Sequence, residues 1–410
     1  MNYVLKNIKQ LLQVREQGII SLKGTDMKLL PSLWDAYLIA EDGKIIDFGT
    51  MENFSSAVLP SKNTEEIDCS GKLVLPAFCD SHTHLVFADT REHEFVDRIK
   101  GLTYEEIAKR GGGILNSAKK LNETSEDELL ESALQRLEEI KRSGTGAVEI
   151  KSGYGLTLEG ELKMLRVIKK LKTTSALTIK ATFLGAHTIP VEYKTKRREY
   201  IKLLTEVMMS KIAEEQLADY CDVFCEKNYF TEEEAIEILE AGLRFGMEPK
   251  IHANQLHISG GVQAGIKMNA VSADHLEFIS DEEIELLKNS DTIATLLPGA
   301  AFFLDMQQSP ARKLLDADVK IALASDYNPG SSPNGRLSFI ISLACIKLKM
   351  TPEEAINAVT INGARAMRVE NDLGSITKGK KANLIITKPI NSIANVPYSF
   401  GNDVIERVII

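Results

Sequence analysis

Eight short apolar segments alternate with amphipathic helical segments between Leu73 and Asp326, and this pattern constrains the fold more than any other feature of the chain. Buried parallel strands have such apolar sequences, and each is joined to the next through a crossover helix. Eight strand–helix units in a stretch of this length predict an α/β fold of the (β/α)8 TIM-barrel type. The strands are expected at the runs Leu73-Val-Leu, Ala147-Val-Glu-Ile, Leu177-Thr-Ile-Lys-Ala-Thr-Phe, Cys221-Asp-Val-Phe, Lys250-Ile-His, Ala270-Val-Ser-Ala, Thr292-Ile-Ala-Thr-Leu-Leu and Ile321-Ala-Leu-Ala.

Local signals mark where the intervening helices begin and end. A serine or threonine followed three residues later by glutamate forms a capping box, and this pattern begins at Ser125, Thr231 and Ser280. Gly144 and Gly246 follow two of these helical segments, at the position where a helix end favours glycine. These helices are expected to form the scaffold, and we assign them no chemistry.

The two ends of the chain have a different pattern, in which short strands are separated by turns. The segment Ala36-Tyr-Leu-Ile-Ala-Glu-Asp-Gly-Lys-Ile-Ile-Asp-Phe places a glycine-bearing loop between two apolar runs, which predicts a β-hairpin. After about residue 370 the chain returns to short strands. We therefore expect a barrel domain of residues 73–370 and a small β-sandwich domain built from both chain ends, residues 1–72 and 371–410.

The composition and the terminal sequence indicate which binding partners and which cellular location to expect for this chain. A formal net charge of −9 argues against nucleic acid or an anionic membrane as the main partner. No apolar run approaches the length needed to span a membrane, and the first residues lack the apolar core and cleavage site of a signal peptide. Five cysteines without a Cys-x-x-Cys motif favour neither a disulfide framework nor a thiolate zinc site. We therefore expect a cytoplasmic protein.

Active sites of TIM barrels lie at the carboxyl ends of the strands, so the residues at these ends are the candidates for chemistry. His82 and His84 share one face of the first predicted strand, because side chains alternate with a period of two. His252, His275 and Asp326 come at the ends of the fifth, sixth and eighth strands. Neutral imidazoles with one carboxylate suit zinc or ferrous iron and leave a position open for water. In chain order, the predicted strand ends are His84, Tyr154, His187, Glu226, Gln255, His275, Pro298 and Asp326.

Longer motifs surround these candidates. They are Asp80-Ser-His-Thr-His-Leu-Val-Phe, Gly111-Gly-Gly-Ile, Glu149-Ile-Lys-Ser-Gly-Tyr-Gly, Thr182-Phe-Leu-Gly-Ala-His, Val271-Ser-Ala-Asp-His, Leu297-Pro-Gly and Ser325-Asp-Tyr-Asn-Pro-Gly-Ser-Ser. With these motifs the chain resembles the amidohydrolase superfamily and, more narrowly, the imidazolonepropionase family of ring-opening enzymes in histidine degradation. The resemblance covers nearly the whole chain, and its more specific parts are Lys151-Ser-Gly-Tyr-Gly and Asp326-Tyr-Asn-Pro-Gly.

The resemblance implies a barrel with a small β domain from both chain ends, and it implies a homodimer. It also implies one divalent metal ion per subunit, either Zn²⁺ or iron as Fe²⁺/Fe³⁺, with His275 beside the ion. The implied metal ligands are His82, His84, His252 and Asp326. The positions implied to contact a small-molecule substrate are Arg91, Tyr154, His187, Gln255, Asn328, Gly330 and Ser331.

The reaction that the resemblance implies is hydrolysis of the cyclic amide C–N bond of 4-imidazolone-5-propanoate, which yields N-formimidoyl-L-glutamate. A metal ion would activate the attacking water. In this scheme Asp326 accepts the water proton, and His275 stabilises the intermediate or relays a proton to the leaving nitrogen. His187 would polarise the ring carbonyl or form a hydrogen bond to it.

Substrate binding in this scheme uses side chains and backbone. The guanidinium of Arg91 is suited to a bidentate contact with the propionate. Tyr154 lies in a glycine-flanked loop and could form a hydrogen bond to the ring or to the carboxylate. Gly330, Ser331 and Ser332 would offer backbone N–H donors.

Three other functions compete with this interpretation. A deaminase of a nitrogen heterocycle in the same superfamily would have a glutamate proton shuttle three residues after the strand-five histidine. Gln255 occupies that position, and its amide cannot ionise to shuttle protons. A binuclear hydrolase needs a bridging lysine, for which Lys180 is badly placed. A catalytically inactive metal-binding barrel is the third alternative. The complete set of metal ligands and the substrate-binding Arg91 argue against it.

Overall fold

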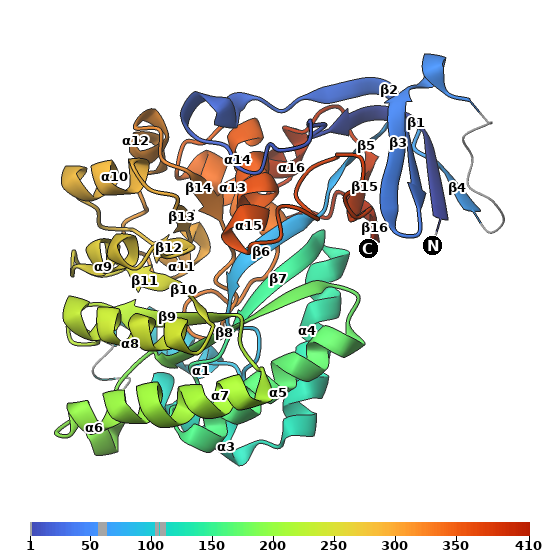
Figure 1. The fold of residues 1–410 in the computed structure, drawn as a ribbon. Helices are drawn as coiled ribbons and strands as arrows, with labels where there is room; N and C mark the ends of the chain where they lie inside the picture. The colour runs from blue at the N-terminus through green and yellow to red at the C-terminus, as the bar shows by residue number, and fades with distance from the viewer. Residues whose placement is uncertain (1, 56–63, 103–105, 107–111) are drawn as a thin grey trace.

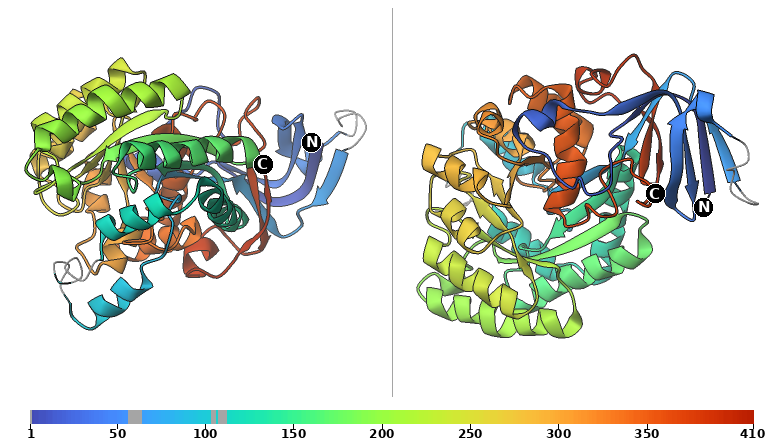
Figure 2. Two further views of the ribbon diagram at one scale, coloured as in Figure 1. Left: turned by 90° about the horizontal axis from the view of Figure 1, so that it is seen from below. Right: turned by 45° about the horizontal axis from the view of Figure 1, so that its top comes forward.

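The computed structural model describes residues 2–55, 64–102, 106 and 112–410, and it contains two sheets (Figure 1). One sheet forms a barrel surrounded by helices, and the other lies at one side of the barrel, where both ends of the chain are found. Figure 2 shows the same two parts from two further directions, with the chain ends close together. Gly111, the first residue of the glycine-rich motif, lies outside the described residues.

Eight parallel strands make up the barrel, and they follow one another around it in chain order. A short additional strand, β10 (Glu248–Pro249), pairs with β9. The eight strands are β6 (Phe78–Thr83), β7 (Thr145–Lys151), β8 (Thr178–Ala186), β9 (Tyr220–Cys225), β11 (Ile251–Ala253), β12 (Ser272–His275), β13 (Ile293–Leu296) and β14 (Ile321–Leu323).

The chain after the last strand returns to the first strand and closes the barrel. The backbone N–H of Asp326 donates to the carbonyl oxygen of His82 at 3.0 Å. The N–H of His84 in turn donates to the carbonyl oxygen of Tyr327 at 2.9 Å. The predicted (β/α)8 barrel is therefore confirmed, and its two ends meet at residues that were expected to hold the metal.

The helices outside the barrel begin where the sequence indicated. In each of the three predicted capping boxes, the hydroxyl of Ser125, Thr231 or Ser280 accepts a hydrogen bond from the N–H of the glutamate three residues later. Gly144 and Gly246 follow their helices with φ of 104° and 80°, a conformation that favours glycine. No helix of the described residues is long and apolar enough to cross a membrane.

The described α-helices are α1 (Glu92–Ile99), α3 (Ile114–Glu123), α4 (Glu126–Arg142), α5 (Leu158–Thr174), α6 (Arg197–Lys202), α7 (Met209–Glu215), α8 (Glu232–Arg244), α9 (Gly261–Lys267), α10 (Asp281–Lys288), α11 (Pro298–Phe303), α12 (Ala311–Asp316), α13 (Leu337–Ile346), α14 (Pro352–Val359), α15 (Ile361–Ala366) and α16 (Asn395–Tyr398).

The second sheet draws on both ends of the chain, as predicted. Its strands lie in the order β16-β15-β5-β1-β2-β3, and β4 also pairs with β1. The predicted hairpin is present as the antiparallel pair β2–β3. Apolar side chains from the N-terminal and C-terminal strands, such as Leu5, Leu38 and Leu384, are buried in one shared core. The strands are β1 (Asn2–Leu12), β2 (Ser32–Glu41), β3 (Lys44–Thr50), β4 (Thr64–Asp68), β5 (Lys72–Pro76), β15 (Leu384–Pro389) and β16 (Ile405–Ile409).

The assignment of Leu73-Val-Leu to the barrel is wrong. This run lies in β5, which pairs with β1 and β15 of the small sheet, and the first barrel strand begins only at Phe78. Between the two strands, the N–H of Ala77 donates to the carbonyl oxygen of Asn383 at 2.9 Å, and Pro76 has no N–H to donate. The residues are apolar on both sides of this break, so the pattern alone did not separate the two strands. One continuous segment therefore serves both sheets.

Candidate active site

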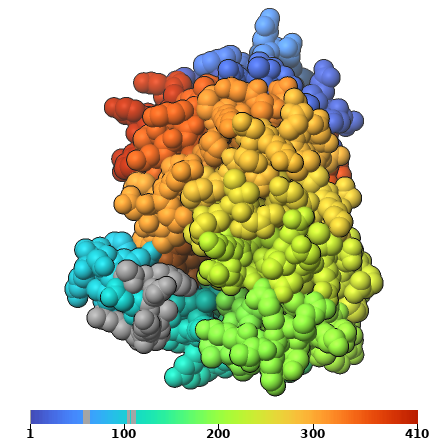
Figure 3. All heavy atoms as spheres, turned by 90° about the vertical axis from the view of Figure 1, so that its left-hand side faces the viewer, coloured from blue at the N-terminus to red at the C-terminus, as the bar shows by residue number. Residues whose placement is uncertain are grey.

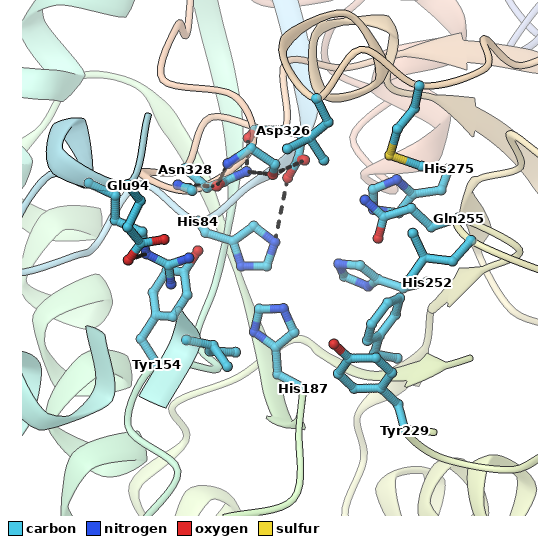
Figure 4. Close-up of a pocket in the computed structure, with 18 of the residues that line it drawn as sticks. His84, Glu94, Tyr154, His187, Tyr229, His252, Gln255, His275, Asp326 and Asn328 are labelled. Atoms are coloured by element: carbon cyan, nitrogen blue, oxygen red, sulfur yellow. Dashed lines mark hydrogen bonds and ion pairs between the residues drawn. The ribbon is translucent and has the colours of Figure 1, made fainter. Parts of the chain in front are cut away.

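Three histidines come together at the end of the barrel strands. His82 lies in β6, His84 directly follows it, and His252 lies in β11. All three are buried, and one ring nitrogen of each lies within 4.8 Å of the others. Asp326 joins them from the segment after β14, with Oδ1 at 3.5 Å from Nε2 of His82 and 3.7 Å from Nε2 of His84. Figure 4 shows His84, His252 and Asp326 around one space.

The chemistry of these side chains fits a divalent metal ion. The Nε2 atoms of His82 and His252 are buried and have no hydrogen-bond partner among the described residues. Burial lowers the pKa of His82 and of His84 well below the ordinary value, so both imidazoles are neutral and can offer a lone pair. Buried nitrogens without partners are costly unless a ligand occupies them. Imidazole nitrogens with one carboxylate oxygen form a donor set that suits zinc or iron.

Buried carboxylates contact two of the histidines, and no motif assigned them this role. Asp274 in β12 lies with Oδ2 at 2.6 Å from Nδ1 of His82. Asp222 in β9 lies with Oδ2 at 3.0 Å from Nδ1 of His252. Both aspartates occur within apolar strand sequences, which was the only available hint.

His275 lies beside this cluster in a strained conformation. Its φ is 85°, and the φ of Asp326 is 52°, both in a region that residues other than glycine seldom adopt. Burial alone would lower the pKa of His275, but Glu277, at 3.5 Å from Nδ1, outweighs it and the pKa is raised. Burial also raises the pKa of Asp326. The site thus pairs a more basic imidazole with a carboxyl group that holds a proton more readily.

A cavity of about 530 Å³ lies over the histidines. In Figure 3 a hollow is visible where the segment containing α1 meets segments from later in the chain. All the positions that were expected to contact substrate line this cavity, whereas His82 lies buried behind its wall. The lining residues that had been anticipated are His84, Arg91, Tyr154, His187, His252, Gln255, His275, Asp326, Asn328, Gly330 and Ser331. Those that had not been anticipated include Glu94, Arg98, Phe224, Tyr229, Leu304 and Met306.

Arg91 is held in the cavity wall with part of its guanidinium unused. Its Nε donates to the hydroxyl of Ser117 at 2.9 Å, and Nη2 is buried without a hydrogen-bond partner among the described residues. The guanidinium carbon lies 5.9 Å from the centre of the Tyr154 ring. Gly330 packs against it so closely that a Cβ at that position would lie 2.6 Å from Nη1. The guanidinium is therefore positioned and can bind an anion.

The loop that carries Tyr154 is anchored by a buried carboxylate. Glu161 accepts hydrogen bonds from the N–H groups of Gly153, Gly155 and Leu156 at 3.1, 2.8 and 2.9 Å. Burial raises the pKa of Tyr154, so its phenol keeps its proton as a donor. Gly155 is needed because a Cβ there would collide with the backbone of Gly160 and Glu161, and Gly153 adopts a φ of 105°, which favours glycine.

His187 has a defined tautomer. Its Nδ1 lies 3.1 Å from the carbonyl oxygen of Gly153, which can only accept, so Nδ1 carries the hydrogen. Burial lowers the pKa of His187 to about 3, so Nε2 holds a lone pair. We had expected His187 to act on the ring carbonyl. As a neutral imidazole it can instead accept a hydrogen bond from a ring N–H.

The turn after β14 differs from the prediction in how its backbone is used. The side-chain oxygen of Asn328 accepts hydrogen bonds from the N–H groups of Gly330 and Ser331 at 2.7 and 2.8 Å. These donors are therefore engaged within the turn and are not free for a substrate, contrary to our expectation. The hydroxyl of Ser331 lies 3.3 Å from Oδ2 of Asp326, so the turn contributes a side-chain hydroxyl beside the metal-binding group.

Comparison with known proteins places this geometry in a family context. The model of the amidohydrolase family matches residues 73–410. The imidazolonepropionase of Flavobacterium johnsoniae is 57% identical over 99% of this chain and 98% of its own length. That of Thermoanaerobacter pseudethanolicus is 42% identical over 94% of this chain and 91% of its own. Among solved structures, E. coli guanine deaminase matches with a TM-score of 0.75 and 13% identity, covering 100% of this chain and 97% of the other, which reflects a shared fold.

Proposed function

The chain belongs to the amidohydrolase family and, within it, to the imidazolonepropionases, and from this premise we propose a reaction and roles for its residues. The enzyme hydrolyses the cyclic amide C–N bond of 4-imidazolone-5-propanoate and yields N-formimidoyl-L-glutamate, a step of histidine degradation. The observation that best supports the substrate is that His84 and His252 line one cavity together with Arg91, whose Nη2 has no hydrogen-bond partner in the described part of the chain.

The metal ion would be held by the Nε2 atoms of His82 and His252 together with His84 and Asp326. Zn²⁺ and iron both suit these donors. When bound, the ion would lower the pKa of a water ligand toward about 7 and polarise the carbonyl group under attack. We further propose a homodimer, as the family resemblance implies, and a location in the cytoplasm, as expected from the composition of the sequence.

The remaining groups orient the substrate across the cavity. Arg91 binds the propionate through charge-assisted hydrogen bonds, and the Tyr154 phenol adds a donor beside it. His187 accepts a hydrogen bond from a ring N–H through Nε2, because its Nδ1 already donates to Gly153. Gln255 offers an amide that forms hydrogen bonds without taking part in proton transfer. The ring is thus held at both its polar edge and its carboxylate tail.

Proton transfer falls to two residues next to the reacting bond. Asp326 accepts the proton of the attacking water, since its carboxylate lies among the histidines that would hold the metal. His275, whose pKa is raised, donates a proton to the leaving ring nitrogen. Without that proton the nitrogen would leave as an unstable anion.

Incubation of the metal-loaded protein with 4-imidazolone-5-propanoate tests the proposal. N-formimidoyl-L-glutamate should appear in step with loss of the substrate, and the His252→Ala variant should form none. Guanine or another heterocycle with an exocyclic amine should release no ammonia, because residue 255 is glutamine. Ammonia release without ring opening would replace this function with a deaminase.

A further inference from the structure

Five charged side chains form a network that is buried against the metal-binding histidines and that the proposed hydrolysis does not use. Glu149 and Lys151 come from β7, Asp222 from β9, Lys250 precedes β11 and Asp274 comes from β12, and none exposes more than 1% of its surface. Together they are three carboxylates and two ammonium groups. Burying so many charges is costly, and such networks persist where they fix a specific arrangement.

Lys151 is the residue that the carboxylates share. Its Nζ lies 2.7 Å from Oε1 of Glu149, 2.7 Å from Oδ2 of Asp222 and 3.6 Å from Oδ2 of Asp274. Lys250 forms an ion pair with the other oxygen of Glu149, so the network has a second cation on its far side. Because Lys151 contacts both aspartates, its positive charge offsets part of the cost of burying the two carboxylates.

Each aspartate in turn contacts one histidine at the ring nitrogen that faces away from the metal position. Oδ2 of Asp274 lies 2.6 Å from Nδ1 of His82, and Oδ2 of Asp222 lies 3.0 Å from Nδ1 of His252. Oδ1 of Asp222 also accepts the backbone N–H of His252 at 3.1 Å, which fixes the carboxylate relative to the strand. A carboxylate oxygen held against an ammonium group acts as an acceptor, so these two contacts favour the hydrogen of each imidazole on Nδ1 and the lone pair on Nε2.

We propose that Lys151, Asp222 and Asp274 form a positioning bracket that holds His82 and His252 as Nδ1–H tautomers, with both Nε2 atoms directed at one metal ion. The inference rests on the metal site proposed above. His84 is the internal contrast, because the carboxylate paired with it among the described residues, Asp326, faces its Nε2, whereas the carboxylates behind His82 and His252 face Nδ1. The bracket therefore fixes the tautomers of His82 and His252, and it does not fix that of His84.

The tautomers can be measured directly on metal-free protein with ¹⁵N-labelled histidine. The ring nitrogens of His82 and His252 should show Nδ1–H in the unmodified chain, with each signal assigned by its loss in His82→Gln or His252→Gln. In Asp274→Asn the His82 signals should move toward the Nε2–H form while those of His252 stay, because an amide can donate to Nδ1. Asp222→Asn should give the reciprocal result. Unchanged tautomers in both variants would overturn the proposal.

Zinc affinity gives the second measurement, by competition with a chromophoric chelator. Asp274→Asn and Asp222→Asn should each weaken Zn²⁺ binding by about 10–100-fold, the usual effect of removing a carboxylate behind a metal-bound histidine. Lys151→Met should weaken it at least as much, and Lys151→Arg should recover part of the loss. If Lys151→Met does not fold, the two aspartate variants still decide the question.

Glu354→Gln is a matched control, because Glu354 is another fully buried carboxylate with a cationic partner, Arg312, outside the cavity lining. It should lower the stability of the fold and change the zinc affinity by no more than about twofold. Aspartate variants that behave like this control, with lower stability but normal affinity and tautomers, would show a purely structural network. Failure of the unmodified chain to bind either Zn²⁺ or Fe²⁺ would refute the proposed metal site, whereas the tautomers of the metal-free protein would still test the bracket.

Discussion

The two sides of the cavity are built in different ways. On the metal side, His82 and His252 belong to barrel strands and are backed by carboxylates on neighbouring strands. On the substrate side, Arg91 immediately precedes α1. Gly330 lies in a turn that is held by hydrogen bonds to the side chain of Asn328. A rigid strand side suits the metal site proposed above, whereas the loop side can change between relatives to select a substrate. Variants on the two sides should therefore fail in different ways.

The largest effect is expected from removing the metal or a ligand on the strand side. Chelation should abolish turnover, and adding Zn²⁺ back should restore it in the unmodified chain but not in His252→Ala. Binding of metal also stabilises the folded state, so the midpoint of thermal unfolding should fall on chelation. Activity that survives complete removal of metal, checked by elemental analysis, would contradict this view of the strand side.

A loss of about 10²–10⁴-fold in kcat is expected for His275→Gln, the usual contribution of a positioned general acid. KM and the affinity for Zn²⁺ should change little, because His275 is assigned to proton transfer. Steady-state kinetics and chelator competition measure the two effects separately. A normal kcat in His275→Gln would show that another group donates the proton to the leaving nitrogen.

Arg91→Ala should act mainly on KM, with kcat/KM lower by about 10–100-fold, as expected when a charge-assisted hydrogen bond is removed. The metal content should remain normal, which separates this side of the cavity from the strand side. A ring analogue without the propionate should bind both proteins equally. An unchanged KM in Arg91→Ala would remove this residue from the site.

Gly330→Ala should raise KM by less than Arg91→Ala does. The added Cβ would lie 2.6 Å from Nη1 of Arg91, and the flexible guanidinium can move aside at the cost of its alignment. The measurement is KM in Gly330→Ala and in the double variant with Arg91→Ala. Equal effects of the alanine at 330 with and without Arg91 would mean that the contact does not matter for binding.

The smallest effect on catalysis is expected from Ser125→Ala, which removes the cap of α4 away from the cavity. The free energy of unfolding should fall by about 1 kcal/mol. Both kcat and KM should be unchanged, and denaturant unfolding with parallel kinetics would check this. A change in KM would link the outer helices to the substrate side.

The sequence predicted the barrel and the histidine cluster because both follow from short-range rules. His82 and His84 share a strand face by their spacing, and barrels gather strand ends, which brought His252 and Asp326 to them. Asp222 and Asp274 could not be assigned, since a carboxylate in an apolar strand acquires its role only through partners distant in the chain. The division into residues 1–72, 73–370 and 371–410 stays a prediction.

Two errors have local physical causes. Leu73-Val-Leu has the composition of any buried strand, and only the pairing of β5 with β1 and β15 shows that it belongs to the small sheet. The N–H groups of Gly330 and Ser331 were expected to face the substrate, but a side-chain oxygen within the same turn accepts both of them. The side-chain oxygen of Asn328 competes with a ligand for the same two N–H donors. The sequence alone does not show which of the two acceptors they bind.

The continuous segment through β5 and β6 has a consequence for engineering. A cut before Phe78, made to isolate the barrel, would free the backbone that leads within a few residues to His82. The junction is also tightly packed, since a Cβ at Gly144 would lie 2.6 Å from Ile405 and 3.0 Å from Phe78. The small sheet is therefore not a detachable module. The first barrel strand, which carries His82, continues directly from this sheet. Destabilising the small sheet should therefore lower the catalytic activity before the barrel itself unfolds.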